Sequence, residues 1–212
     1  MLNVQDKQGL LACSRCPRLV AHRRTVEKDY PSYYNRPVAP WGDRRGRVLV
    51  VGLAPGLHGA ARTGQAFIGD ASGTLLFSAL EEAGFCRTTE GGVVKLQGVT
   101  LTNAVKCLPP QNAPTTSETR SCLDYLVREL ESLAGPGNRL PRVVVALGGI
   151  AYRAVGKALS TRLPPFQHGL SLQLDRNLHF VASYHPSRLN VNTGRLTKEM
   201  FHKVFKDVAA LT

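Results

Sequence analysis

The chain of 212 residues is 43% hydrophobic, which is enough for one α/β domain with a buried core. No stretch approaches the roughly 18 consecutive apolar residues of a membrane span, and the first residues lack the apolar segment of a secretory signal, so we expect a cytoplasmic protein without a membrane partner. With 27 Lys and Arg residues against 15 Asp and Glu residues, the net charge of +12 favours a polyanionic partner, solubility alone being the simpler alternative.

Strand-like and helix-like segments alternate along the chain. Hydrophobic periodicity and turn residues predict helices at residues 1–27 (interrupted by a turn at 13–17), 72–84, 115–133, 149–159 and 197–211. Strands are predicted at residues 47–51, 93–97, 99–105, 142–147 and 179–184, with an ordered but irregular loop at 30–43. A capping box formed by Thr115 and Glu118 opens the third helix, and the glycines at 135 and 137 end it.

The alternation of strands and helices favours a parallel sheet between two helical layers. We predict a three-layer α/β/α sandwich around a central, mostly parallel four-stranded sheet, in a single domain spanning residues 1–212.

A glycine-rich segment at residues 52–73 follows the apolar run at 48–51 directly. It contains six glycines, which permit backbone conformations and close approaches that other residues resist. A flexible linker is the simpler interpretation, but Phe67 and Asp70 within the segment favour a loop that faces a ligand.

Four of the five cysteines form two pairs. Cys13 and Cys16 have the C-x2-C spacing, whereas fourteen residues separate Cys107 from Cys122. Four thiolates can hold either a tetrahedral zinc ion or a 4Fe–4S cluster, and the wide second spacing favours the cluster; unrelated buried cysteines are the alternative. Such a site would staple the segment 1–27 to the middle of the chain. Cys86 fits neither pair, and the odd count argues against a disulfide framework.

Three segments, taken together with these cysteines, resemble the iron–sulfur uracil-DNA glycosylases, and most closely type 5. They are Gly-Leu-Ala-Pro-Gly at 52–56 with Phe-Ile-Gly-Asp at 67–70, Thr-Asn-Ala-Val-Lys-Cys at 102–107, and His-Pro-Ser-Arg-Leu-Asn at 185–190. The resemblance implies a 4Fe–4S cluster on Cys13, Cys16, Cys107 and Cys122. It also implies a monofunctional enzyme of base excision repair, associated with the nucleoid, that flips uracil out of double-stranded DNA. Hydrolysis of the N-glycosidic bond would leave an abasic site, and other deaminated bases such as hypoxanthine are implied as further substrates.

The same resemblance assigns roles to individual residues. Asp70 and His185 are the implied catalytic residues. Asn103 would read O4 and N3–H of uracil through its amide, Phe67 would stack on the flipped base, and His185 would donate a hydrogen bond to O2. The remaining implied substrate contacts are to the DNA around the flipped base. Leu189 would insert into the base stack as an apolar wedge, and Arg188 would face DNA. Ser187 and the backbone of the 52–56 turn would clamp phosphates, the turn residues being Gly52, Ala54, Pro55 and Gly56.

One position departs from the related type 4 enzymes. They carry an acid where this chain has Leu53, and a leucine cannot activate water. Type 5 relatives point to Asp70 as the substitute carboxylate, which would orient water and stabilise positive charge on the sugar. The simpler interpretation is that Asp70 only caps the helix that follows it.

Other functions stay open at this point. The chain is expected to be a monomer whose partner is DNA, and the alternatives are a type 4-like uracil-DNA glycosylase or a non-catalytic iron–sulfur module that only binds DNA. A nucleotide-phosphate enzyme is disfavoured, because the glycine-rich segment has neither a Gly-Lys-Ser/Thr ending nor the G-x-G-x-x-G spacing.

Overall fold

The sheet at the centre of the molecule has six strands in the order β1-β5-β2-β6-β8-β7. The computed structural model describes residues 4–43, 45–90, 92–134 and 142–212. The four inner strands run parallel and are mostly buried, because helices cover both faces; they are β5 (Val99–Asn103), β2 (Val48–Gly52), β6 (Arg142–Leu147) and β8 (Leu178–Ser183). The predicted four-stranded parallel sheet is thereby confirmed as the inner part of a larger sheet.

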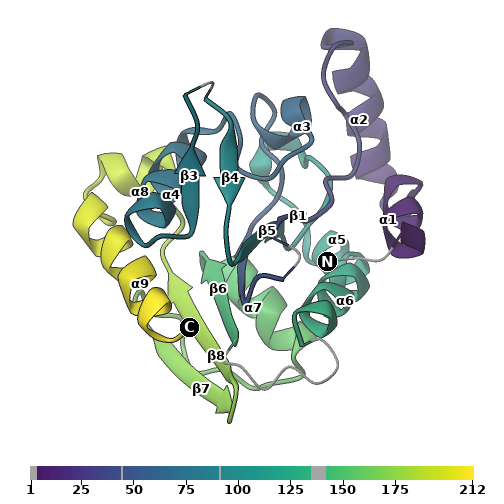
Figure 1. Cartoon of the computed structure of the whole chain (residues 1–212). Coiled ribbons are helices and arrows are strands. Elements are labelled where there is room, and N and C mark those ends of the chain that lie inside the picture. Colours follow the sequence, from purple (N-terminus) through teal and green to yellow (C-terminus); the bar gives the residue numbers. More distant parts are fainter. Residues whose placement is uncertain (1–3, 44, 91, 135–141) are drawn as a thin grey trace.

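Two antiparallel edge strands enlarge the sheet beyond the prediction. β1 (Trp41–Gly42) pairs with β5, and β7 (Ser171–Asp175) pairs with β8. β1 has only two residues and lies in the proline-rich loop at 30–43, whereas β7 alternates exposed with half-buried residues and lacks an apolar run. A separate two-stranded sheet joins β3 (Cys86–Thr88) to β4 (Val94–Leu96) (Figure 1).

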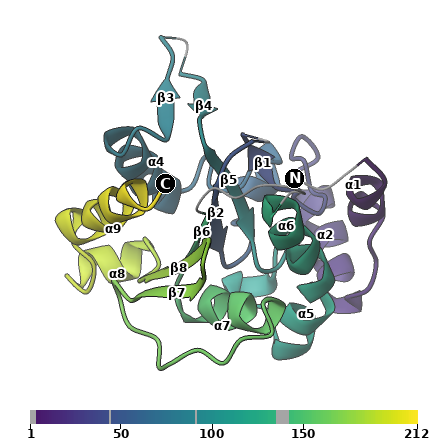
Figure 2. The same cartoon turned by 60° about the horizontal axis from the view of Figure 1, so that its bottom comes forward.

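Helices pack against both faces of the sheet, as the two views of the chain show (Figures 1 and 2). The longer helices are α1 (Val4–Leu11), α2 (Pro17–Asp29), α4 (Ala71–Glu82), α5 (Thr116–Ser121), α6 (Leu123–Ala134), α7 (Gly149–Ala158) and α9 (Lys198–Ala210). Short helical turns complete the described structure: α3 (Ala60–Thr63), the 3₁₀ turn η1 (Pro110–Asn112) and α8 (Arg188–Asn192). The three-layer α/β/α sandwich is confirmed.

Two apolar cores flank the sheet. On one face, side chains of α4 and α9, including Leu76, Phe201 and Phe205, pack against the strands. On the other face, Leu126 of α6 and Val155 of α7 do the same. Both inward faces match the helical period of apolar residues in the sequence.

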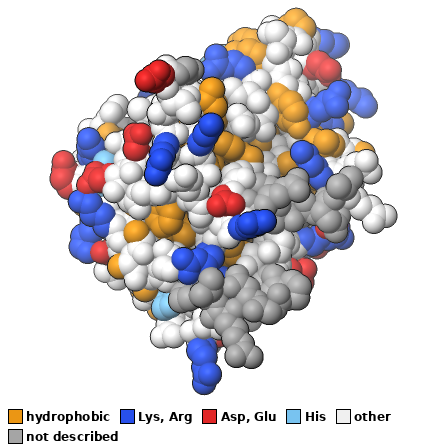
Figure 3. Space-filling model, in the orientation of Figure 1, with side chains coloured by type: hydrophobic (Ala, Val, Ile, Leu, Met, Phe, Trp, Pro, Cys, Tyr) orange, Lys and Arg blue, Asp and Glu red, His pale blue; other side chains and the backbone are white. Residues whose placement is uncertain are grey.

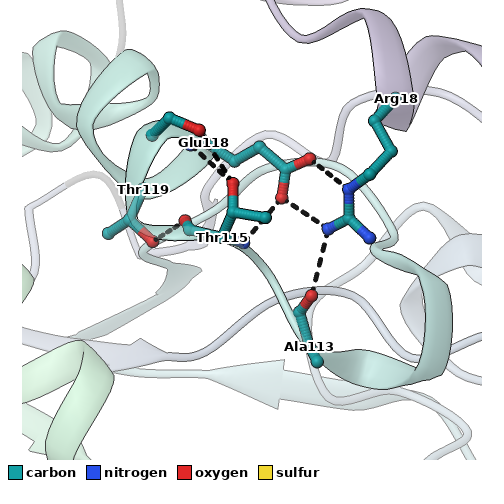
Figure 4. Close-up of polar contacts among 6 residues, drawn as sticks. Arg18, Ala113, Thr115, Glu118 and Thr119 are labelled. Carbon is teal, nitrogen blue, oxygen red and sulfur yellow. Dashed lines mark hydrogen bonds and ion pairs between the residues drawn. The ribbon is translucent and has the colours of Figure 1, made fainter.

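The predicted capping box is present at the start of α5 (Figure 4). The Glu118 backbone N–H donates to Thr115 Oγ1 at 3.2 Å, and the Thr115 backbone N–H donates to Glu118 Oε2 at 2.7 Å. Arg18 of α2 donates to both Glu118 carboxylate oxygens, at 2.8 and 2.7 Å. The cap of α5 therefore also ties α2 to the body of the domain.

One predicted helix differs in the structure. The helix expected to run unbroken over 115–133 is divided at Cys122 into α5 and α6. The glycines at 135 and 137, predicted to end it, lie outside the residues that the structure describes. Within the described ranges, no helix is long and apolar enough to cross a membrane.

Candidate active site

A cavity of about 380 Å³ opens at the carboxyl ends of β2, β5 and β8. Ligands of parallel α/β sheets bind at this edge, because the loops that leave the strands there converge. The cavity brings together eight residues that the sequence analysis singled out: Leu53, Ala54, Gly56, Phe67, Asp70, Asn103, His185 and Ser187. These residues come from three segments that are far apart in the chain.

Asp70 precedes α4 and turns its carboxylate toward the cavity rather than capping the helix. It occupies the N-cap position, yet its side chain makes no capping hydrogen bond. The carboxylate lies against two glycines: a Cβ atom would meet its Oδ1 at 2.7 Å on Gly56 and its Cγ at 2.1 Å on Gly59. Helix capping is therefore not what its side chain does, and both glycines are required by the space that the carboxylate fills.

The surroundings of Asp70 oppose its ionisation only in part. Burial raises the pKa of the carboxyl group, while the backbone N–H of Ala60 and the charges of Arg62 and His58 act in the opposite direction. A carboxylate in these surroundings is poorly solvated, so its negative charge interacts strongly with any positive charge that forms in the cavity.

Phe67 is held in a backbone conformation that is unusual for a bulky residue. Its φ is +69°, in the left-handed region, and its side chain is buried. A Cβ atom on Gly73 would lie 1.8 Å from the Phe67 carbonyl oxygen, and one on Gly52 would lie 2.5 Å from the ring. Two glycines thus make room for a strained loop that presents an aromatic ring at the cavity, which is typical of functional sites.

Asn103 is the last residue of β5 and is almost fully buried. It pairs in register with Gly52 of β2, where a Cβ atom would come within 2.5 Å of Asn103 Oδ1. The side-chain amide therefore lies at the strand end, beside the ring of Phe67, with one donor and one acceptor group.

His185 follows β8 and lines the cavity opposite the glycine-rich loop. Burial lowers the pKa of its imidazole to about 4, so the ring is neutral at physiological pH. Asn190 Nδ2 donates to the His185 carbonyl oxygen at 2.8 Å, which fixes the backbone at this position. A neutral imidazole can donate one hydrogen bond without bringing a positive charge into the cavity.

Four of the other predicted contact residues lie around the cavity rather than in its wall, whereas Ser187 lines it. Pro55 is buried beside the turn, and Gly52 contributes close backbone packing. Arg188 and Leu189 are exposed on α8, Leu189 with 72% of its surface accessible. Ser187 reaches the cavity and also accepts a hydrogen bond from the Asn190 backbone N–H at the start of α8.

Three cavity residues were missed by the sequence analysis, namely Ala60, Ser72 and Asn112. Asn112 has φ of +55° and lies in the η1 turn after two prolines. The Pro-Pro-Gln-Asn sequence signals a turn, but nothing local shows that the turn closes over strand ends from another part of the chain.

The four paired cysteines line a second pocket, together with Leu10, Leu19 and Tyr125. Burial, and to a smaller extent the proximity of the other three thiols, raise the pKa of Cys107 to about 12. Four thiolates at this place therefore need a positive group among them, as a metal cluster provides. Among the described residues, no three His, Cys, Asp or Glu side chains are arranged to hold a metal ion. Cys86 packs in the core that includes α4 and α9, away from this pocket, and its S–H donates to the Phe77 carbonyl oxygen.

Comparisons with known proteins identify the family of this chain. The model of the uracil DNA glycosylase superfamily matches residues 39–209. A type-5 uracil-DNA glycosylase of Pyrobaculum aerophilum is 46% identical over 209 residues, covering 95% of this chain and 89% of the relative. The type-5 enzyme of Thermus thermophilus is 45% identical, covering 96% of this chain and 95% of the relative. A type-4 uracil-DNA glycosylase of Archaeoglobus fulgidus is 31% identical, with 69% of this chain and 68% of the relative covered.

Proposed function

The chain belongs to the uracil DNA glycosylase superfamily and is 45–46% identical to two of its type-5 enzymes, and on this premise we propose that it removes uracil from double-stranded DNA. The observation that carries the proposal is the convergence of Asp70, Asn103 and His185 on one cavity at the strand ends. The whole chain, residues 1–212, is proposed to act as one glycosylase domain and as a monomer.

Recognition of the base uses two residues. A base in a duplex is out of reach, so the nucleotide is flipped into the cavity, where Phe67 stacks on the ring. The Asn103 amide accepts from N3–H and donates to O4 of uracil. Cytosine presents the opposite pattern at both positions, and this mismatch supports discrimination between the two bases.

Bond cleavage uses the other two residues. The bond between C1′ and N1 breaks with its electron pair leaving on uracil, and the neutral His185 imidazole donates to O2, where negative charge collects. Asp70 stabilises the positive charge on the sugar and takes a proton from the water whose oxygen bonds to C1′. Leu53 lines the cavity with a side chain that cannot activate water, so the task falls to Asp70.

Contacts to the DNA backbone surround the cavity in this proposal. The exposed Leu189 inserts into the base stack that uracil has left, Arg188 faces the phosphates, and Ser187 with the amides of Ala54 and Gly56 clamps a phosphate. Pro55 supplies rigidity only, since it has no N–H. Lys and Arg side chains are spread over the face shown in Figure 3, which suits a long polyanion. The enzyme is proposed to work in the cytoplasm on the nucleoid.

The function is tested with paired duplexes that contain uracil, hypoxanthine or no damaged base. We expect uracil to be released and an alkali-labile abasic site to remain, without a strand break before alkali. Hypoxanthine is proposed as a second substrate. Duplex binding with a steep salt dependence but no abasic product would instead identify a non-catalytic DNA-binding module.

Asn103→Asp separates recognition from folding, because it replaces the amide by a group of the same shape. We expect a loss of about 10²-fold in single-turnover excision of uracil, as a site built to hydrogen-bond its substrate loses most when a pairing is removed. Full activity of this variant would contradict the proposed role of Asn103. Thr100→Val on the same strand, outside the cavity, is the matched control.

A 4Fe–4S cluster on Cys13, Cys16, Cys107 and Cys122 is also proposed, with zinc as the alternative. The support is the shared pocket and the mutual repulsion of thiolates that lie together there. The cluster would be a structural staple that joins the segment 1–27 to the middle of the chain.

The protein is expected to be yellow-brown, with iron and acid-labile sulfide in equal amounts. Cys107→Ser should lose most of the colour and lower the unfolding temperature, whereas Cys86→Ser should keep the colour because Cys86 packs in another core. A colourless protein with one zinc ion per chain would overturn this assignment. The measurements are the visible spectrum, metal analysis and thermal unfolding.

A further inference from the structure

A charged lysine is completely buried next to the candidate active site. Lys106 has no exposed surface, and its Nζ donates three hydrogen bonds. The acceptors are Thr102 Oγ1 at 2.7 Å, the Asn103 carbonyl oxygen at 2.6 Å and Glu129 of α6 at 2.8 Å. All three donors of the ammonium group are therefore used.

A buried ion pair is by itself weak evidence for a role in stability. Two buried charges lose their hydration, and apolar side chains of similar volume often stabilise a protein equally well or better. The acceptors indicate another role, because two of the three belong to Thr102 and Asn103, the last two residues of β5. One of them is the carbonyl oxygen of Asn103 itself.

Lys106 also touches the cysteine pocket. Its backbone N–H donates to Cys122 Sγ at 3.4 Å, and the residue is among those that line that pocket. One residue thus contacts the end of β5, α6 and the cysteine pocket together. Its ammonium group is enclosed and does not line the active-site cavity, so it is not placed to attack a sugar.

We propose that Lys106, paired with Glu129, is a positioning residue that holds Asn103 in the orientation that reads uracil. The inference rests on the proposed role of Asn103. Lys106 anchors the backbone of Asn103 from behind, and Glu129 anchors Lys106 to α6. Since small displacements of a substrate-orienting group are costly, the loss of this anchor lowers the rate of excision without weakening DNA binding.

The test replaces both charges at once, by Lys106→Met with Glu129→Leu, since removing only one would leave an unpaired buried charge. We expect the single-turnover rate on uracil duplex to fall by about 10- to 100-fold. The affinity for undamaged duplex and the visible spectrum stay unchanged. His202→Leu with Glu82→Met, which removes an ion pair between α9 and α4 away from the cavity, is the matched control and keeps the full rate.

A double-mutant cycle distinguishes positioning from a general structural effect. If the pair acts through Asn103, the same double replacement costs little in the Asn103→Asp background. An equal loss in both backgrounds, or an unchanged rate in the folded double variant, overturns the inference. If the double variant does not fold, Thr102→Val decides the question: it removes one acceptor, and we expect a rate loss of about fivefold. A fully active Thr102→Val then overturns the inference.

The two proposals fail in different ways. If Asn103→Asp excises uracil at the full rate, the proposed recognition of uracil is wrong. If Asn103→Asp is impaired while the charge replacement is not, the proposed function stands and only the positioning role of Lys106 is lost.

Discussion

Replacement of His185 by Ala is expected to lower the single-turnover rate of uracil excision by about 10²–10³-fold, which is typical for the removal of one donor that faces developing negative charge. The reason lies in the geometry of the cavity: the half-buried imidazole lines its wall, so its hydrogen bond to the base is made away from bulk water once the base fills the cavity. The measurement is a rapid-quench assay with enzyme in excess over a uracil duplex.

The pH profile adds a second test of His185. Because burial lowers the pKa of this imidazole to about 4, the ring stays neutral from pH 6 upward and the donor does not change with pH there. A rate that falls with a midpoint near 6.5 as the pH rises, and that no longer does so in His185→Ala, would contradict a neutral donor.

A matched control for His185→Ala comes from the same strand. His179 lies at the amino end of β8, away from the cavity, whereas His185 follows the carboxyl end. His179→Ala should keep the full rate of excision, so that an equal loss in both variants would point to a general effect on the sheet.

Asp70→Asn is expected to lower the rate by about 10²–10⁴-fold, the usual contribution of a positioned acid or base. The two side chains have the same shape, so the variant removes only the charge that stabilises the sugar and accepts the proton. Since burial raises the pKa of Asp70, its ionised form is disfavoured by folding, and the variant should be at least as stable as the parent. Asp207→Asn, on the exposed face of α9, is the control.

The acid side of the pH profile reports the same carboxylate. Excision requires ionised Asp70. Activity is therefore full above the pKa of this carboxyl group and is lost as the pH falls through that pKa. Because that pKa is raised above the usual value of 3.8, the loss should begin at a higher pH than for an exposed aspartate. Asp70→Asn should not show this loss of rate at low pH. A full rate in Asp70→Asn would show that another group handles the water.

Local sequence predicted the elements whose pattern reflects burial. The inner strands are continuous apolar runs because both of their faces are covered, and the last helix shows its inward residues at helical spacing. The capping box at the start of α5 could also be predicted, since Thr115 and Glu118 lie within one helical turn of each other. β7 was missed because its two apolar residues, Leu172 and Leu174, alternate with polar ones and form no continuous apolar run. The break at Cys122 was missed because helical periodicity continues across it.

The candidate site was predicted only in part. Motifs identified Asp70, Asn103 and His185 as candidate site residues. The place of Asn112 in the cavity and the complete burial of Lys106 could not be predicted from the neighbouring sequence. A lysine in a loop-forming motif reads as a surface residue, because burial of a charge depends on a partner that α6 supplies from a distant part of the chain.

The sequence by itself determined the class of fold, the succession of the inner strands and helices along the chain, and the family. These depend on side-chain patterns within short segments and on motifs in a set order. Only the tertiary structure decided that the Asp70 carboxylate fills the space of two glycines rather than capping α4, that the half-buried His185 imidazole is neutral, and that the enclosed Lys106 side chain donates to the Asn103 carbonyl oxygen. Each of these depends on desolvation and on distances between separate segments, which arise when the chain has folded.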